Sequence, residues 1–204
     1  MRTAEEYAKA FPEHVVVTSG GESILETIES GKVIVLATPG AEPRAAGGYA
    51  LVVLMDTWLM LSRDDVRVVE ESHRRWFNAL ALARETAPAV AVGDAVTLQA
   101  LVRADPIGLA SRELATRAET HLPPVGRLGT VDGPADVVEP LAGRTWTPNT
   151  EVLGPVPQDD GERLVVRAPR REGAALAAAL KAVQAERSAA KMPPVRVRVD
   201  PLTF

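Results

Sequence analysis

The sequence contains no cysteine among its 204 residues, so it can form neither a disulfide framework nor a thiolate metal site. Aromatic residues make up only 4% of the chain. The longest apolar run, residues 49–61, is interrupted by Asp56 and is too short to span a bilayer. The first residues also lack the apolar segment of a secretory signal. We therefore expect a protein of a reducing compartment, with the cytoplasm as the default location.

Sequence motifs of nucleotide hydrolysis and nucleophilic catalysis are missing as well. No Gly-x-x-x-x-Gly-Lys-Ser/Thr run marks a phosphate-binding P-loop. Ser19 lacks the Gly-x-Ser-x-Gly frame of a nucleophile elbow, although residues 18–21 could hold an anion on backbone N–H groups if they are not an ordinary turn. The three histidines have no neighbouring ligand at metal spacing. We predict no catalytic residue and no metal ligand, and we do not expect the chain to be an enzyme by itself.

The first half of the sequence alternates between strand and helix patterns. Apolar, β-branched runs predict strands at 14–18, 33–37, 49–55 and 89–92. Helices are predicted at 5–10, 22–29, 64–84, 95–102 and 106–120. Such alternation is typical of an α/β protein with a parallel, three-layered sheet. The paired prolines Pro123 and Pro124 stop the last of these helices, so the predicted domains are 1–122 and 123–204.

The second half has a different order of elements. The pattern predicts strand 125–131, helix 134–142, strand 150–156, strand 162–168, helix 173–189 and strand 195–199. This βαββαβ order is that of the split-βαβ, ferredoxin-like fold. The whole chain is therefore expected to be α/β followed by α+β.

The C-terminal end is basic, whereas the rest of the chain is acidic. Residues 162–204 hold nine Lys/Arg and four Asp/Glu, a net +5, and the other residues hold 14 against 23, a net −9. Strand periodicity places Arg196 and Arg198 on one face and gives Arg163 and Arg167 a common face. Arg127 is expected to join them on a sheet face that the helices leave uncovered.

Such a face is a candidate platform for phosphates or an acidic peptide. It has no aromatic residue, so we do not expect bases to stack on it. The alternative is an ordinary solvated face, neutralised by Glu162, Asp200 and neighbouring carboxylates.

Short motifs in a fixed order carry a family resemblance. They include Val17-Thr-Ser-Gly-Gly21, Ala37-Thr-Pro-Gly-Ala-Glu-Pro43, Gln99-Ala-Leu-Val-Arg103, Leu122-Pro-Pro124, Glu151-Val-Leu-Gly-Pro-Val156 and Val197-Arg-Val-Asp-Pro201. With them the chain resembles, over essentially its whole length, the C-terminal part of the actinobacterial, helicase-defective form of the PriA family of primosomal replication-restart proteins. The resemblance implies a remnant of the second helicase lobe in residues 1–122. It implies a C-terminal domain similar to ribosomal protein S-ten in residues 123–204.

The same resemblance implies that the nucleotide site is degenerate. Active family members carry arginines that contact ATP at the end of the long helix, and here Ala81 replaces one of them while Arg84 remains. The loop 37–43 also lacks the Gln and Lys-Gly of the active motif. The family binds zinc and ATP through other residues that this chain does not contain, so we expect no cofactor here and no helicase activity.

The resemblance further implies the partners. They are forked or single-stranded DNA, single-stranded-DNA-binding protein and other primosome proteins. Arg171 matches an arginine that lines the family's pocket for the acidic tail of single-stranded-DNA-binding protein, whereas Ala175 replaces a polar residue there. The predicted binding residues are Arg127, Arg163, Arg167, Arg171, Arg196 and Arg198.

Two other functions fit the residues alone. One is a small α/β enzyme whose loop 40–48 closes a pocket at the carboxyl ends of the strands. The other is a ferredoxin-like module that binds proteins through a dry, apolar interface.

Overall fold

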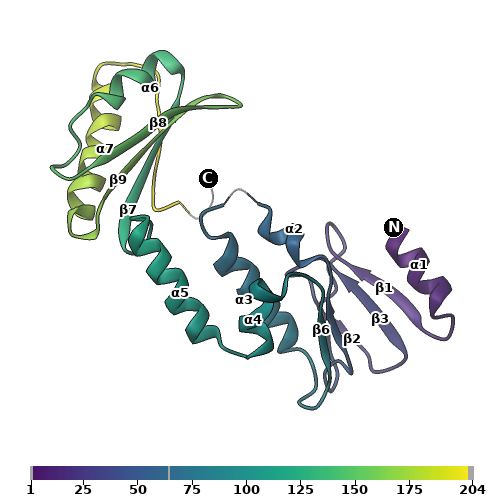
Figure 1. The fold of residues 1–204 in the computed structure, drawn as a ribbon. Coiled ribbons are helices and arrows are strands. Elements are labelled where there is room, and N and C mark those ends of the chain that lie inside the picture. Colours follow the sequence, from purple (N-terminus) through teal and green to yellow (C-terminus); the bar gives the residue numbers. More distant parts are fainter. Residues whose placement is uncertain (1, 64, 202–204) are drawn as a thin grey trace. The chain divides into compact units, whose positions relative to one another are not determined.

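The computed structural model describes residues 2–63 and 65–201. The chain divides into two compact units, Met1–Pro106 and Ile107–Phe204 (Figure 1). Helix α5 (Pro106–Glu119) runs from the last residue of the first unit into the second. The domain boundary between residues 122 and 123 that the sequence predicts lies after this helix and stays a prediction. None of the helices in the described ranges is long and apolar enough to cross a membrane.

The first unit is built from short strands in parallel pairs. Strand β1 (Val15–Ser19) pairs with β3 (Val33–Ala37), β2 (Thr27–Ile28) with β4 (Arg44–Ala45), and β5 (Val52–Leu54) with β6 (Ala89–Ala91). The parallel direction agrees with the sequence. The single sheet that the sequence predicts is not found among the described residues, because no ladder joins one pair to the next.

Four helices accompany these strands: α1 (Arg2–Ala10), α2 (Thr57–Leu61), α3 (Val68–Leu80) and α4 (Ala95–Val102). Their core contains Leu54, Met60, Trp76, Ala79, Leu98 and Leu101. The helix predicted at 64–84 corresponds to α3, which is shorter than expected. Residue 64, its expected first residue, lies outside the described residues.

The predicted helix at 22–29 is wrong. Ser23 instead bridges back to Gly20, and residues 27–28 form β2. The N–H of Leu25 donates to the Ser19 hydroxyl at 3.0 Å, a contact that pins this segment in a turn. Eight residues are too few to stabilise a helix without packing, so these long-range contacts override a weak propensity.

The second unit has the order of elements that the sequence predicts. After α5 come β7 (Gly126–Gly133), α6 (Ala135–Ala142), β8 (Glu151–Gln158), β9 (Gly161–Pro169), the 3₁₀ turn η1 (Arg170–Glu172), α7 (Gly173–Ala189) and β10 (Arg196–Val199). The four strands form one antiparallel sheet in the order β10-β7-β9-β8.

Helices α6 and α7 cover the same face of the sheet. Val131 and Leu164 are opposite each other across β7 and β9, and both are fully buried against Leu176 and Leu180 of α7 and Val138 of α6. Gly129 allows α7 to approach, because a Cβ atom there would lie 2.5 Å from a methyl carbon of Leu180. The opposite face of the sheet carries no helix from this core cluster.

This packing gives a stability prediction. Replacing the buried Leu164 by alanine is expected to lower the free energy of unfolding of the second unit by about 2–5 kcal/mol, because it leaves a cavity. Leu153→Ala is the matched control, since Leu153 is on β8 and 45% exposed. Urea unfolding, followed by amide hydrogen exchange of β9, measures both. Equal losses in the two variants would contradict the assigned core.

Candidate functional site

Cross-strand register decides which arginines share a face of the second unit's sheet. Asp132 lies between Arg163 of β9 and Arg196 of β10, and Thr130 lies opposite Arg198. Arg167, four residues after Arg163 on β9, projects to the same side. We call Arg163, Arg167, Arg196 and Arg198 the arginine face. It is the side opposite to the core residues Val131 and Leu164, as expected from the sequence.

Arg127 does not belong to the arginine face, so this part of the expectation is wrong. It lies opposite Ala168, a core residue, and therefore points to the side that the helices cover. A Cβ atom on Gly173, the first residue of α7, would be 2.8 Å from the Arg127 side chain. Its guanidinium is paired with Asp200. The sequence predicts the strand correctly but assigns Arg127 to the wrong face of the sheet. Successive residues of a strand lie on opposite faces, so an error of one residue exchanges the faces.

Carboxylates neutralise much of the arginine face. Asp132 accepts hydrogen bonds from Arg163 Nε and from Arg198 Nη2, the latter at 3.1 Å. The three side chains are only 16–23% exposed. Arg167 is paired with Glu151, which also contacts Nδ1 of His121 at 3.3 Å. Arg167, and after it His121, lower the pKa of Glu151. Asp132 and Glu151 are thus the carboxylates that neutralise the arginine face, while Asp200 is paired with Arg127.

Two of the predicted arginines remain well exposed to solvent. Arg196 stands at the start of β10, and Arg171 lies on η1 with 76% of its side chain exposed. Arg171 approaches Glu172 only to 3.9 Å. The other four arginines of the predicted set are half-buried, so Arg171 and Arg196 are its exposed members, although they belong to different parts of the unit.

Arg167 has a structural contact that the sequence did not reveal. Its Nη1 donates to the carbonyl of Thr120 at 2.6 Å, and Arg117 and Arg170 donate to Pro123 and Pro124 at 3.0 Å. Three guanidinium groups thus hold the carbonyls of the connection between α5 and β7. The signal in the sequence is the pair of prolines, which keeps this connection out of a helix, so that its carbonyls need donors from elsewhere.

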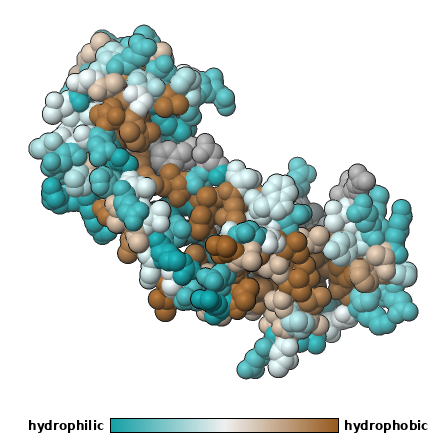
Figure 2. Space-filling model, in the orientation of Figure 1, coloured by the Kyte–Doolittle hydropathy of each residue, from teal (hydrophilic) through white to brown (hydrophobic). Residues whose placement is uncertain are grey.

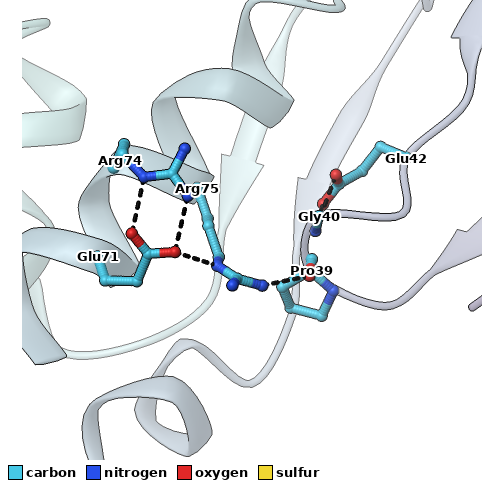
Figure 3. Close-up of polar contacts among 6 residues, drawn as sticks. All are labelled: Pro39, Gly40, Glu42, Glu71, Arg74 and Arg75. Carbon is cyan, nitrogen blue, oxygen red and sulfur yellow. Dashed lines mark hydrogen bonds and ion pairs between the residues drawn. The ribbon is translucent and has the colours of Figure 1, made fainter. Parts of the chain in front are cut away.

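A second polar cluster lies at the end of β3 in the first unit (Figure 3). Arg75 donates from Nη1 to the carbonyl of Pro39 at 2.6 Å and from Nε to Glu71 at 2.7 Å. The carboxylate of Glu42 accepts the N–H of Gly40 at 2.9 and 3.0 Å. The loop's own carboxylate thus occupies the backbone donor that an external anion would use.

Arg84, the predicted remnant of the nucleotide site, follows helix α3 and contacts the same loop at its other end. Its Nε donates to the carbonyl of Gly48 at 3.1 Å, and its side chain is exposed. The loop is therefore held by Arg75 near Pro39 and by Arg84 near Gly48. The sequence missed Arg75, although its place four residues after Glu71 on a helix indicates an ion pair.

A groove of about 520 Å³ opens beside this loop. Its lining includes Thr38 and Glu42 after β3, Asp56 after β5, and Arg75 of α3. Ser19 does not face an open site. It is 1% exposed, and its hydroxyl donates to Ala41 at 2.6 Å while accepting from Leu25. Ser19 is therefore an anchor for the loop.

His73 is a core histidine. It is 2% exposed, with Nδ1 2.9 Å from the carbonyl of Val69 and Nε2 3.1 Å from that of Thr97. No group of three or more His, Cys, Asp or Glu residues suited to a metal ion is found within residues 2–63 and 65–201.

Comparison with known proteins identifies the second unit. Residues 118–202 match the family described as the primosomal protein N C-terminal domain. This region is a PriA C-terminal domain. The chain is also 38% identical over 228 residues to the probable replication restart protein PriA of Mycobacterium tuberculosis (strain ATCC 25618 / H37Rv), and 40% identical over 223 residues to that of Mycobacterium leprae (strain TN). Each alignment covers 98% of the chain.

The resemblance to the C-terminal part of PriA is therefore confirmed. The chain spans about a third of the length of these relatives, 35% and 34% respectively. The matched region includes both units, because the alignments extend over nearly all of the 204 residues, whereas the domain family covers only the second.

The cluster around Glu71 gives a prediction for pH dependence. Arg74, and after it Arg75, lower the pKa of Glu71 from 4.5 to about 2 by hydrogen bonding. A lowered pKa in the folded state stabilises the fold above pH 4.5, and this stabilisation is lost as the pH falls towards about 2. Arg74→Ala is expected to move the Glu71 midpoint, followed by the NMR shift of its carboxyl carbon, back towards 4.5.

Arg144→Ala is the control for this titration, because Arg144 is bonded to Glu186 and lowers the pKa of that carboxyl instead. It should raise the Glu186 midpoint and leave that of Glu71 unchanged. An unchanged Glu71 midpoint in the Arg74→Ala variant would show that the ion pair does not form in solution.

Proposed function

We propose that this chain is the C-terminal part of a replication restart protein and acts as a non-catalytic binding module for branched or single-stranded DNA. Its further partners are single-stranded-DNA-binding protein and other primosome proteins. The observation that carries the proposal is the similarity to PriA proteins over 98% of the chain. What those relatives' names say, replication restart, is extended here to this chain.

The topology supports a finer assignment of each unit. A βαββαβ chain whose strands lie in the order β10-β7-β9-β8 supports a ferredoxin-like fold for residues 123–204. The parallel strand pairs, of which β5 and β6 are joined through helices α2 and α3, support a helicase-lobe remnant for residues 1–122. The predicted cytoplasmic location remains part of this proposal.

Charge supports binding to a nucleic-acid backbone rather than to bases. Arg171 and Arg196 offer exposed guanidinium groups to phosphates, and Arg171 is also suited to an acidic peptide tail. Asp132 engages Arg163 and Arg198, and Glu151 engages Arg167. Because few cations stay available, the expected affinity is modest, independent of base sequence and dependent on salt in proportion to the small number of phosphate contacts.

The contacts in the first unit support the absence of ATP-driven unwinding. Glu42 places a negative charge on the loop beside Gly40, where it would repel a nucleotide phosphate. Arg75 is committed to Glu71 and Pro39, and Arg84 to Gly48. The groove beside this loop keeps one alternative open, a small α/β enzyme, which binding of a phosphate ester in that groove would favour.

DNA affinity tests the two exposed arginines. The double variant Arg171→Ala/Arg196→Ala is expected to bind a forked DNA more weakly than the parent chain. Its salt dependence, the slope of log affinity against log salt, should become shallower by roughly 0.7–0.9 per lost phosphate contact. Fluorescence anisotropy at several salt concentrations measures both quantities.

The matched control is Arg74→Ala/Arg144→Ala, which removes the same charge from arginines bonded to Glu71 and Glu186. Its salt slope should equal that of the parent. Equal effects of the two double variants would mean that only net charge matters, and the proposed surface would be wrong.

Asp132→Asn tests the arginine face in the opposite direction. The substitution keeps the shape of the side chain but removes the charge that engages Arg163 and Arg198. DNA affinity is expected to increase and its salt dependence to become steeper. Asp136→Asn, on α6, changes the net charge equally and is expected to leave both quantities unchanged. An unchanged affinity in Asp132→Asn would remove the arginine face from the proposed interface.

A further inference from the structure

The groove of the first unit is bounded by the edges of two strands. Its lining includes consecutive residues of β3 and the turn after it, 35–39, and consecutive residues around β5, 51–56. Side chains of a strand alternate between two faces, so a cavity on one face would be lined by every second residue. An unbroken run indicates that the backbone edge itself borders the groove. Each strand is paired on its other edge, β3 with β1 and β5 with β6.

The ladder hydrogen bonds identify the main-chain groups that face the groove. Thr38 donates to Ser19 of β1, and Val52 donates to Pro88 beside β6. In a parallel ladder, successive residues direct their N–H and C=O groups alternately to the neighbouring strand on one side and to the opposite side. Even-numbered residues of β3 and β5 therefore pair within their own ladders. The N–H and C=O groups of odd-numbered residues, Val35 and Ala37 on β3 and Val53 on β5, are directed to the groove side.

Two helices hold the strand pairs together across the groove. Helix α1 packs against β1, and its Tyr7 hydroxyl donates to the sulfur of Met55, just after β5. Helix α3 packs against β5, and its Arg75 donates to Pro39, just after β3. Thr3 of α1 and Trp76 of α3 both line the groove. The space between the pairs is therefore spanned by helices on either pair, and no ladder joins β3 to β5 among the described residues.

The groove is apolar, and the side chains around β5 are open to solvent. Leu51, Val53 and Met55 are each nearly half exposed. Figure 2 shows apolar side chains among polar ones on the surface of this unit. The charged lining residues are of both signs, Glu42 and Asp56 with Arg63 and Arg75, so net charge does not select an occupant. The occupant is instead selected by shape and by main-chain hydrogen bonding.

We infer that this groove binds an extended, apolar polypeptide segment, which adds a strand between β3 and β5 and joins the two pairs into one five-stranded sheet. A strand lies about 4.8 Å from each neighbour and rises about 3.3 Å per residue, so five or six residues match the lined length. Its alternate side chains would contact Trp76 and Ala79 of α3. Main-chain hydrogen bonds supply affinity in this mode of recognition, and side-chain pockets supply specificity.

The source of the segment rests on the proposed function, while the groove itself does not. The PriA relative of Mycobacterium tuberculosis is matched over only 35% of its length, so most of that polypeptide lies outside the matched region. The added strand is assigned to that unmatched part. A central strand of this kind is buried on both faces, which requires an apolar sequence.

The experiment uses overlapping ten-residue peptides that cover the unmatched part of the Mycobacterium tuberculosis relative, each added to the 204-residue chain. One apolar peptide is expected to bind saturably and to slow amide exchange at Val35, Ala37 and Val53 at least about tenfold. Leu36 and Leu54 should change little, since they are already paired within their ladders. Binding without this alternation would overturn the strand geometry.

Two variants sharpen the result. Val53→Pro removes a groove-facing N–H and is expected to weaken the bound peptide at least about tenfold. Ala91→Pro is the control, because Ala91 is on β6 and its N–H is directed away from β5 and from the groove. N-methylation of alternate amides in the peptide gives the same test without changing the protein. If no peptide binds, or if Val53→Pro only abolishes self-association of the chain, the assigned segment is wrong. DNA binding by the second unit is unaffected in either case.

Discussion

The pairing of β7 with β9 is the constraint on which the second unit depends. It sets Val131 opposite Leu164 beneath the helices, and it sets Asp132 opposite Arg163 on the other side. Core and arginine face are therefore two consequences of one register. A slip by one residue would bury Arg163 and expose Leu164, which would cost both the apolar packing and the ion pair. Selection for a stable core thus also fixes where the guanidinium groups stand.

The same register explains why basic charge in the sequence is a poor guide to an available cationic surface. Residues 162–204 have a net charge of +5, yet Asp132 and Glu151 come from strands earlier in the chain and engage three of the four face arginines. Charge counted along the chain omits such partners. Only the fold shows that Arg196 and Arg171 retain the exposure that a phosphate contact needs.

What the sequence predicts best are elements with strong local signals. Helices 95–102 and 173–189 agree with the structure to the residue, because the first begins after the N-cap residue Asp94 and the second is rich in alanine. Residues 22–29 have no such signal, and distant pairing with residues 44–45 decides their conformation. The face of Arg127 is predicted wrongly for a similar reason, since at the start of β7 the face of a residue depends on where pairing with β9 begins. Among the contacts of Glu42, Glu71 and Arg75, the bond from Arg75 to Pro39 links segments far apart in the chain and cannot be read from the sequence, whereas the Glu71–Arg75 spacing can.

The edge strands of the second unit carry features that prevent further strand pairing, whereas the strand edges at the groove of the first unit do not. In the second unit, edge strand β8 carries Pro155, Pro157 and a bulge between Leu153 and Val156, and edge strand β10 carries two arginines. Such features discourage further pairing. Within the first unit, β3 reads Val-Ile-Val-Leu-Ala and β5 Val-Val-Leu, without proline or charge inside either strand. An edge that stays exposed normally acquires such protection, because it otherwise aggregates. Two unprotected edges that face the same groove are therefore better explained as partners of a strand than as the rim of a small-molecule pocket.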